Sequence, residues 1–200
     1  MQLGEKWQTV IFSDEKKFNL DGPDGLHSYW RDLRREPHSI MSRNFGGGSL
    51  MIWAAISYQG KSDIAFLDGR QNSQAYCATL ENYLLPFSKS KHEGGFIFMQ
   101  DNAAIHKSSL MKRWFEEHQT LLLDHPALSP DLNPIENCWG MFLARSVYKE
   151  GKQYQSIAEL KESILGSWNG IELSTIRDLI DSMIIRLRDV LLNKGGITKY

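Results

Sequence analysis

Short apolar runs bounded by turn-forming residues occupy the first part of the chain and predict a sheet. Residues 9–20 (TVIFSDEKKFNL) predict one strand, and residues 49–69 predict two strands joined near residues 58–61. FIFM at 96–99 and TLLLD at 120–124 predict two further short strands. We therefore expect a central sheet to which distant parts of the chain contribute.

Helical spacing of apolar residues takes over between and after these strands. Apolar residues recur at helical intervals from Tyr76 to Phe87, although Pro86 should end or kink that helix. Residues 106–119 (HKSSLMKRWFEEHQ) predict another helix. SIAE (156–159) has the pattern of a capping box and should open a helix that runs to about Trp168.

The last predicted helix carries one long amphipathic stripe that residues 195–196, both glycine, should end. We expect this stripe to pack into the core, without a partner helix. Its apolar members are Ile176, Leu179, Ile180, Met183, Ile184, Leu187, Val190 and Leu191. Strands come first, strands and helices then alternate, and helices finish the chain, so the pattern predicts a mixed α/β domain.

Composition and charge narrow the function only slightly. The 200 residues suffice for one domain with a substantial core, and 42% of them are hydrophobic. The net charge of −1 gives no general attraction for nucleic acid, so any such contact must come from local patches, metal ions or a segment outside this chain. Cys77 and Cys138 suit a reducing compartment, and the longest apolar run, residues 50–56, is too short to cross a bilayer.

The stretch HPALSPDLNPIENCWG (125–140) places one acid after an unusually stiff loop. Three prolines exclude helix over residues 126–133, Asn133 is a good N-cap, and Pro134 suits the first helical position. Glu136 then falls in the first turn. Asn133 and Glu136 have the spacing of a capping box, but a stiff loop also fixes a carboxylate as a metal ligand requires. This stretch alone leaves both interpretations open.

Two further acids, Asp14 and Asp101, follow the apolar runs of predicted strands. Each alone could cap a turn. Together with Glu136 they could converge at one edge of the sheet, where clustered carboxylates repel one another unless hard cations lie between them. Oxygen ligands suit Mg²⁺ or Mn²⁺, and two such ions about 4 Å apart support phosphoryl transfer. No P-loop glycine pattern is present, which argues against a nucleoside triphosphatase.

Several motifs in this order resemble the catalytic domain of Tc/mariner superfamily transposases, of the Tc branch. They are FSDEKKF, GGGSLMIWAAIS, LLPF, MQDNAAIH, SPDLNPIENCWG and KGGITKY, which span nearly the whole chain. The 86 residues between Asp14 and Asp101, and the 34 between Asp101 and Glu136, agree with that branch. The resemblance assigns the catalytic and metal-binding triad to these three acids.

The resemblance implies a ribonuclease-H-like fold, an α/β mixed sheet flanked by helices with extra C-terminal helices. It implies an enzyme that uses two Mg²⁺ or Mn²⁺ ions to cut transposon ends and to join the freed 3′-hydroxyl to target DNA at TA sites. It further implies DNA as partner, a homodimer for the full-length protein, no membrane association and a nuclear location. Residues 1–200 would form a single catalytic domain, without the N-terminal helix-turn-helix region that the family normally carries.

Candidate DNA-binding residues lie near the triad and in a locally basic stretch. The candidates are Lys16, Lys17, Trp30, Arg31, Arg34, Arg35, Arg43, Asn102 and His106. His106 could position a water or a phosphate, or it could begin the next helix. Trp30 and Arg31 fall where the family has a clamp between subunits, although a solvated loop is the alternative. Two other functions stay open for the chain: a metal-dependent nuclease that cuts without joining, and a transposon-derived module that binds DNA or protein without catalysis.

Overall fold

The computed structural model describes residues 6–23, 48–127, 129–196 and 198. The predicted residues Trp30, Arg31, Arg34, Arg35 and Arg43 lie outside this described part. No described helix is both long and apolar enough to cross a membrane.

A mixed sheet forms the centre of the molecule. Its order is β3-β2-β1-β5-β6, and β4 also pairs with β2. β1 and β2 are antiparallel over their length, whereas β5 runs parallel to β1 and β6 runs parallel to β5. The strands are β1 (Val10–Asn19), β2 (Ser49–Ser57), β3 (Gly60–Lys61), β4 (Ala65–Leu67), β5 (Ile97–Met99) and β6 (Leu121–Leu122).

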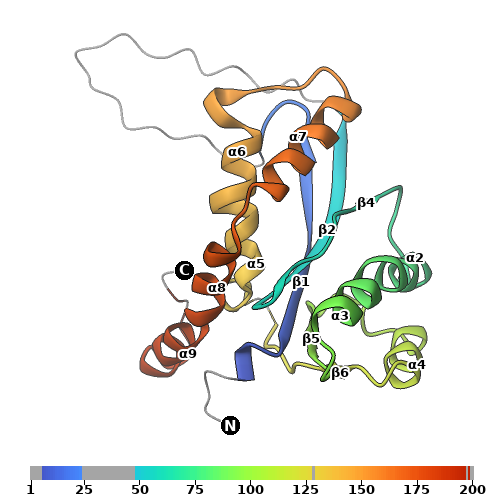
Figure 1. Cartoon of the computed structure of the whole chain (residues 1–200), viewed down its shortest axis with the longest axis vertical. Coiled ribbons are helices and arrows are strands. Elements are labelled where there is room, and N and C mark those ends of the chain that lie inside the picture. Colours follow the sequence, from blue (N-terminus) through green and yellow to red (C-terminus); the bar gives the residue numbers. More distant parts are fainter. Residues whose placement is uncertain (1–5, 24–47, 128, 197, 199–200) are drawn as a thin grey trace.

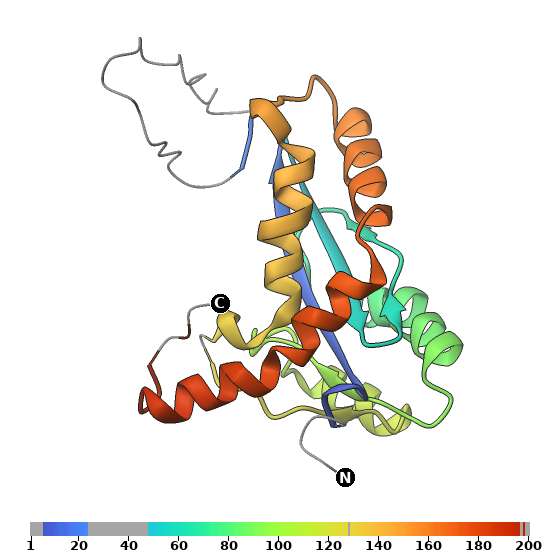
Figure 2. The same ribbon diagram turned by 60° about the vertical axis from the view of Figure 1, so that its left-hand side comes forward.

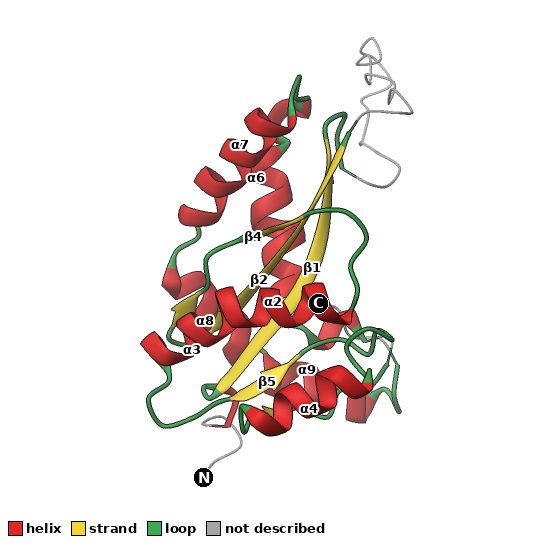
Figure 3. Cartoon of the chain, turned by 90° about the vertical axis from the view of Figure 1, so that its right-hand side faces the viewer, coloured by secondary structure: helices red, strands yellow, loops and turns green. Residues whose placement is uncertain are grey.

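Helices cover both faces of this sheet (Figures 1 and 3). One group packs on the face that carries Phe12, and the other packs on the face that carries Ile11. On the Phe12 face lie α5 (Pro134–Asn137), η3 (Cys138–Ala144), α6 (Arg145–Val147), α7 (Ile157–Asn169) and α8 (Leu173–Asp181), followed by α9 (Met183–Leu192). On the Ile11 face lie α2 (Ser73–Thr79), η1 (Leu80–Leu84), α3 (Leu85–Lys91) and α4 (Ser109–Glu117). Two short 3-10 turns complete the path: η2 (Pro130–Leu132) and η4 (Lys149–Gly151).

The alternation of side chains along β1 explains why the sheet has two cores. Successive side chains of a strand point to opposite faces. Val10 and Phe12 are fully buried beneath α5 and η3, while Ile11 is fully buried beneath α2 and α4. The same alternation sends Asp14 to the first face and Glu15 to the second, which separates two adjacent acids.

The predicted helix around Pro86 continues through the proline instead of ending there. α2 passes into the π-helical turn η1, and α3 follows with Pro86 in its first turn. The Leu85 amide donates to the Leu80 carbonyl, five residues back. Widening the turn before the proline accommodates a residue that cannot donate a helical hydrogen bond.

Most of the terminal stripe packs on the core as predicted, but it spans two helices and not one. The helix breaks at Ser182, whose hydroxyl donates to the Leu179 carbonyl at 2.6 Å, and α9 leaves the sheet as an arm (Figure 2). Ile176 and Ile180 are buried, but Ile184 is 47% exposed and Leu191 is 79% exposed. Continuous periodicity therefore spans two helices, and Met183, Leu187 and Val190 of the second still pack on the core.

Candidate active site

The sheet brings the three predicted acids together from three separate segments. Asp14 lies within β1, opposite Ala54 of β2, as the predicted strand over residues 9–20 places it. The pairing of β1 with β5 stops at Phe12 and Met99, so Asp14 stands just beyond the shorter strand. Asp101 follows β5 by two residues, and Glu136 lies in α5.

All three carboxylates line one cavity of about 360 Å³. Its remaining walls come from the end of β5, the following turn and the proline-rich loop: Met99, Asn102, Ala103, His125, Pro126, Ala127, Ser129, Pro130 and Asn133. The proline-rich loop therefore forms a wall of the same cavity that Glu136 lines. This explains the heavy use of proline before Glu136 better than a capping role would.

The capping-box interpretation of Glu136 is wrong in its key contact. Asn133 is the N-cap residue with extended backbone, and Pro134 takes the first helical position, as predicted. However, the Asn133 side chain makes no capping bond. Its Nδ2 donates instead to the Ser13 carbonyl of β1 at 3.1 Å. This bond holds the loop against β1, where the Ser13 carbonyl is buried and needs a donor.

Asp14 lies in an environment that disfavours its ionised form. Burial, together with the negative charges of Glu136 and Glu15, raises the pKa of Asp14 to about 8. The indole Nε1 of Trp139 donates to Asp14 Oδ2 at 3.1 Å and fixes the direction of the carboxylate. Trp139 is fully buried in the core, so this donor cannot move away. A cation placed between Asp14 and Glu136 would relieve their repulsion.

Asp101 is held by a buried histidine. His106 Nδ1 lies 2.6 Å from Asp101 Oδ1, which also accepts the Ala103 amide at 2.9 Å. The hydrogen bond from His106 lowers the pKa of Asp101 although burial opposes it. Burial lowers the pKa of His106, but its bonds to Asp101 and Glu15 outweigh that effect and raise the pKa to about 9.

His106 thus connects Asp101, which follows β5, with Glu15 of β1. Its Nε2 lies 3.5 Å from Glu15 Oε1, and its ring contacts the Tyr76 ring at a tilt of 31°, with centroids 4.0 Å apart. The alternative that His106 caps the next helix is not supported, since Ser108 is the N-cap of α4 and accepts the Met111 amide. Both ring nitrogens of His106 face carboxylates, so His106 holds the Asp101 side chain in place and does not cap a helix.

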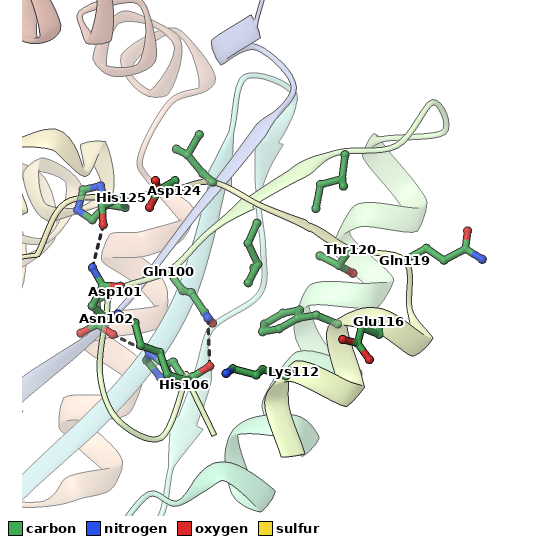
Figure 4. A pocket seen from close by; sticks show the side chains of 15 residues that line it. Gln100, Asp101, Asn102, His106, Lys112, Glu116, Gln119, Thr120, Asp124 and His125 are labelled. Atoms are coloured by element: carbon green, nitrogen blue, oxygen red, sulfur yellow. Dashed lines mark hydrogen bonds and ion pairs between the residues drawn. The ribbon is translucent and has the colours of Figure 1, made fainter. Parts of the chain in front are cut away.

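The other described residues that were predicted to bind DNA differ in their position relative to the cavity. Asn102 donates to the His125 carbonyl at 2.8 Å and joins the two loops at the cavity mouth. Lys16 is half-buried on the Asp14 face of β1, and Lys17 is exposed on the opposite face. Figure 4 shows a neighbouring pocket of about 740 Å³ into which Lys112 and Gln100 also point. The two pockets share Asp101, Asn102 and His125.

The carboxylate oxygens of the three acids are suitable ligands for hard divalent cations. In this structure, however, the three acids are too far apart to bind one common ion. Within the described ranges, no three His, Cys, Asp or Glu side chains are grouped closely enough to hold a single ion. Asp14 and Glu136 interact directly, whereas Asp101 lines the same cavity with one oxygen held by His106. Three carboxylates on one cavity, with the pKa of Asp14 raised by burial and by the charge of Glu136, are a site that Mg²⁺ or Mn²⁺ suits.

The strand order, the helices on both faces and the acids at the point where β1 extends past β5 define a ribonuclease-H-like domain. Comparisons with known proteins agree. A family model described as DDE superfamily endonuclease matches residues 9–161. The transposable element Tc3 transposase of Caenorhabditis elegans is 45% identical over 198 residues, which cover 99% of this chain and 60% of that protein.

A second relative and a solved structure extend these similarities. The transposable element Tcb2 transposase of Caenorhabditis briggsae is 35% identical over 98% of this chain and 72% of its own length. The crystal structure of the mariner Mos1 paired end complex with Mg superposes with a TM-score of 0.82 at 20% identity, over 96% of this chain and 57% of that one. The chain belongs to the DDE superfamily of endonucleases, among the Tc/mariner transposases. It spans about three fifths of the length of the Tc3 relative.

Proposed function

We propose that this chain is the catalytic domain of a transposase that cuts DNA at transposon ends and joins the freed 3′-hydroxyl to target DNA. The single observation that carries this proposal is the cavity lined by Asp14, Asp101 and Glu136 together. These acids come from three segments of the chain, and a binding module would have no use for all of them. Membership in the DDE endonuclease superfamily supports the same assignment.

Asp14, Asp101 and Glu136 would hold two Mg²⁺ or Mn²⁺ ions in the cavity that they line. Such ions, when bound, activate the attacking oxygen and stabilise the leaving oxygen of a phosphodiester. The protein's own part is orientation: Trp139 directs Asp14, His106 directs Asp101, and the proline-rich loop fixes the start of the helix that bears Glu136. That the Mos1 complex with a comparable fold contains Mg supports this choice of ion.

DNA as substrate, insertion at TA sites, a homodimer for the full-length protein and a nuclear location complete the proposal. They rest on family membership and not on contacts within this chain. The low net charge is consistent with a catalytic domain that receives its DNA from another region.

Nicking of supercoiled plasmid in Mg²⁺ or Mn²⁺ tests the catalytic assignment. We expect Asp14→Asn, Asp101→Asn and Glu136→Gln each to lower the nicking rate at least about 100-fold, because each removes charge stabilisation from the transition state. Asp181→Asn, an exposed acid of α8, is the matched control and should nick like the parent chain. Unchanged nicking by Asp101→Asn or Glu136→Gln would remove the proposal's basis.

A further inference from the structure

One buried residue, Ser13, bonds to both of the segments that carry the other two acids. Ser13 directly precedes Asp14 in β1 and is 1% exposed. Its hydroxyl donates to the Met99 carbonyl at 2.9 Å, and its own carbonyl accepts Asn133 Nδ2 at 3.1 Å. Met99 ends β5 two residues before Asp101, and Asn133 stands three residues before Glu136.

The Ser13 hydroxyl extends the sheet one link beyond its last strand pair. The register of β1 with β5 ends at Phe12 and Met99. Past that point the two strands separate, and Asp14 and Asp101 lie on the diverging ends. A side-chain bond at this place fixes how far apart the two backbones are where the acids begin.

The Asn133 side-chain amide makes the second of these bonds, and only one orientation of the amide is possible. The Ser13 carbonyl can only accept, so the amide nitrogen must face it. The Asn133 backbone carbonyl accepts the Glu136 amide at 3.0 Å, which connects the side-chain bond to the first turn of α5. Asn133 is 4% exposed, and its Oδ1 has no hydrogen-bond partner among the described residues.

We propose that Ser13 and Asn133 are positioning residues that set the spacing of Asp14, Asp101 and Glu136 for metal binding. This inference rests on the proposed metal-dependent function. Ser13 does not line the cavity, and Asn133 lines it without adding a charge. They act by holding β5 and the start of α5 against the part of β1 that bears Asp14.

The fold itself depends little on these two bonds. β1 pairs with β2 from Phe12 to Asn19, and the helix that begins at Pro134 is anchored by fully buried Ile135 and Trp139. Truncating Asn133 removes a hydrogen bond but also removes a buried acceptor that lacks a partner, so the two effects on folding oppose each other. Loss of metal affinity without loss of folding is therefore the signature of a positioning role.

Mn²⁺ binding to residues 1–200, counted by electron paramagnetic resonance of the free ion, tests this inference. We expect Asn133→Ala and Ser13→Ala to weaken Mn²⁺ binding about 10–100-fold, the range seen when residues that orient metal ligands are removed. Their thermal midpoints should stay near that of the parent chain. Ser13→Thr keeps the hydroxyl and suits a strand, so it should restore binding. Ser88→Ala removes a buried hydroxyl that donates to the Leu85 carbonyl far from the cavity, and should bind normally.

The outcomes separate this inference from the function on which it rests. Parent-like Mn²⁺ affinity in both alanine variants would overturn it, as would a Ser13→Thr variant that melts normally but binds as weakly as Ser13→Ala. Glu136→Gln reports on the site itself. If Glu136→Gln binds Mn²⁺ as the parent chain does, the metal site proposed above is wrong, and the positioning role falls with it.

Discussion

At the scale of single residues, Asp14 best shows how the surroundings change an acid's chemistry. Burial and the charge of Glu136 raise its pKa from 3.8 to about 8, so the fold favours its protonated form. The stability gained from this protonation is fully present below pH 4 and is lost as the pH rises through about 8. The metal-free domain should therefore become less stable over this range.

The Asp14→Asn variant isolates this effect, because asparagine stays neutral and can still accept the bond from Trp139. We expect the variant and the parent chain to unfold alike at pH 4 in a chelator. At pH 9 the variant should be more stable by roughly 1–3 kcal/mol, the usual size of a single-residue effect. Urea unfolding at both pH values measures this. Asp181→Asn should change little at either pH, and a less stable Asp14→Asn at pH 9 would show that the carboxylate is not repelled there.

Whether the sequence could predict a residue's role depended on how far away in the sequence its interaction partners lie. Asp14, Asp101 and Glu136 were identifiable because their motifs are local and characteristic. Asn133 is the N-cap residue as predicted, but the capping-box spacing could not indicate its actual side-chain partner, Ser13, which lies 120 residues away. The contacts of Trp139 with Asp14 and of His106 with Glu15 are likewise set by strand and helix packing, and no spacing rule contains them.

At the scale of elements, α9 supports the loop that leads to Glu136. Arg186 of α9 is fully buried. Its Nη1 donates to the Asp131 carbonyl at 2.6 Å, and its Nη2 donates to Asn137 Oδ1 at 2.8 Å. These two acceptors flank Glu136 on either side. An arm that looks peripheral in Figure 2 thus holds the proline-rich loop and α5 from the side opposite β1.

Replacing Arg186 tests the structural importance of this arm. We expect Arg186→Met to lower the free energy of unfolding by roughly 2–3 kcal/mol, because it leaves two half-buried acceptors without their charged donor. Arg188→Met, an exposed arginine of the same helix, is the control and should have little effect. Urea denaturation of both variants decides, and equal stability of the two would contradict the support that we assign to α9.

The observed strands and helices show how far apolar periodicity predicts secondary structure. Existence and type of the strands and helices were predicted well, and the helix from SIAE is confirmed: Ser156 accepts the Glu159 amide at 3.2 Å. The Glu159 side chain reaches the Gln155 amide, one residue before the expected partner. The break at Ser182 was missed, because an apolar stripe keeps its spacing across a change in helix direction.

At the scale of the whole molecule, the central claim is that distant segments converge on one metal-binding cavity. Apolar patterns predict a sheet but not the order of its strands, so the sequence alone could only suggest that the acids meet. The ribonuclease-H-like order came from the resemblance, and the structure agrees with it. What the resemblance lacked was the set of buried bonds, through Ser13, His106 and Arg186, that fixes each acid relative to the others.

Anomalous diffraction from crystals of residues 1–200 soaked in Mn²⁺ tests this claim most directly. The account predicts anomalous density inside the cavity, between Asp14 and Glu136 and toward Asp101, and its loss in Glu136→Gln. Binding of Mn²⁺ to carboxylates alone is weak without DNA, so the soak should use millimolar metal at a pH above 8, where Asp14 is ionised. Anomalous peaks elsewhere on the chain, with none among these three acids under those conditions, would contradict the account.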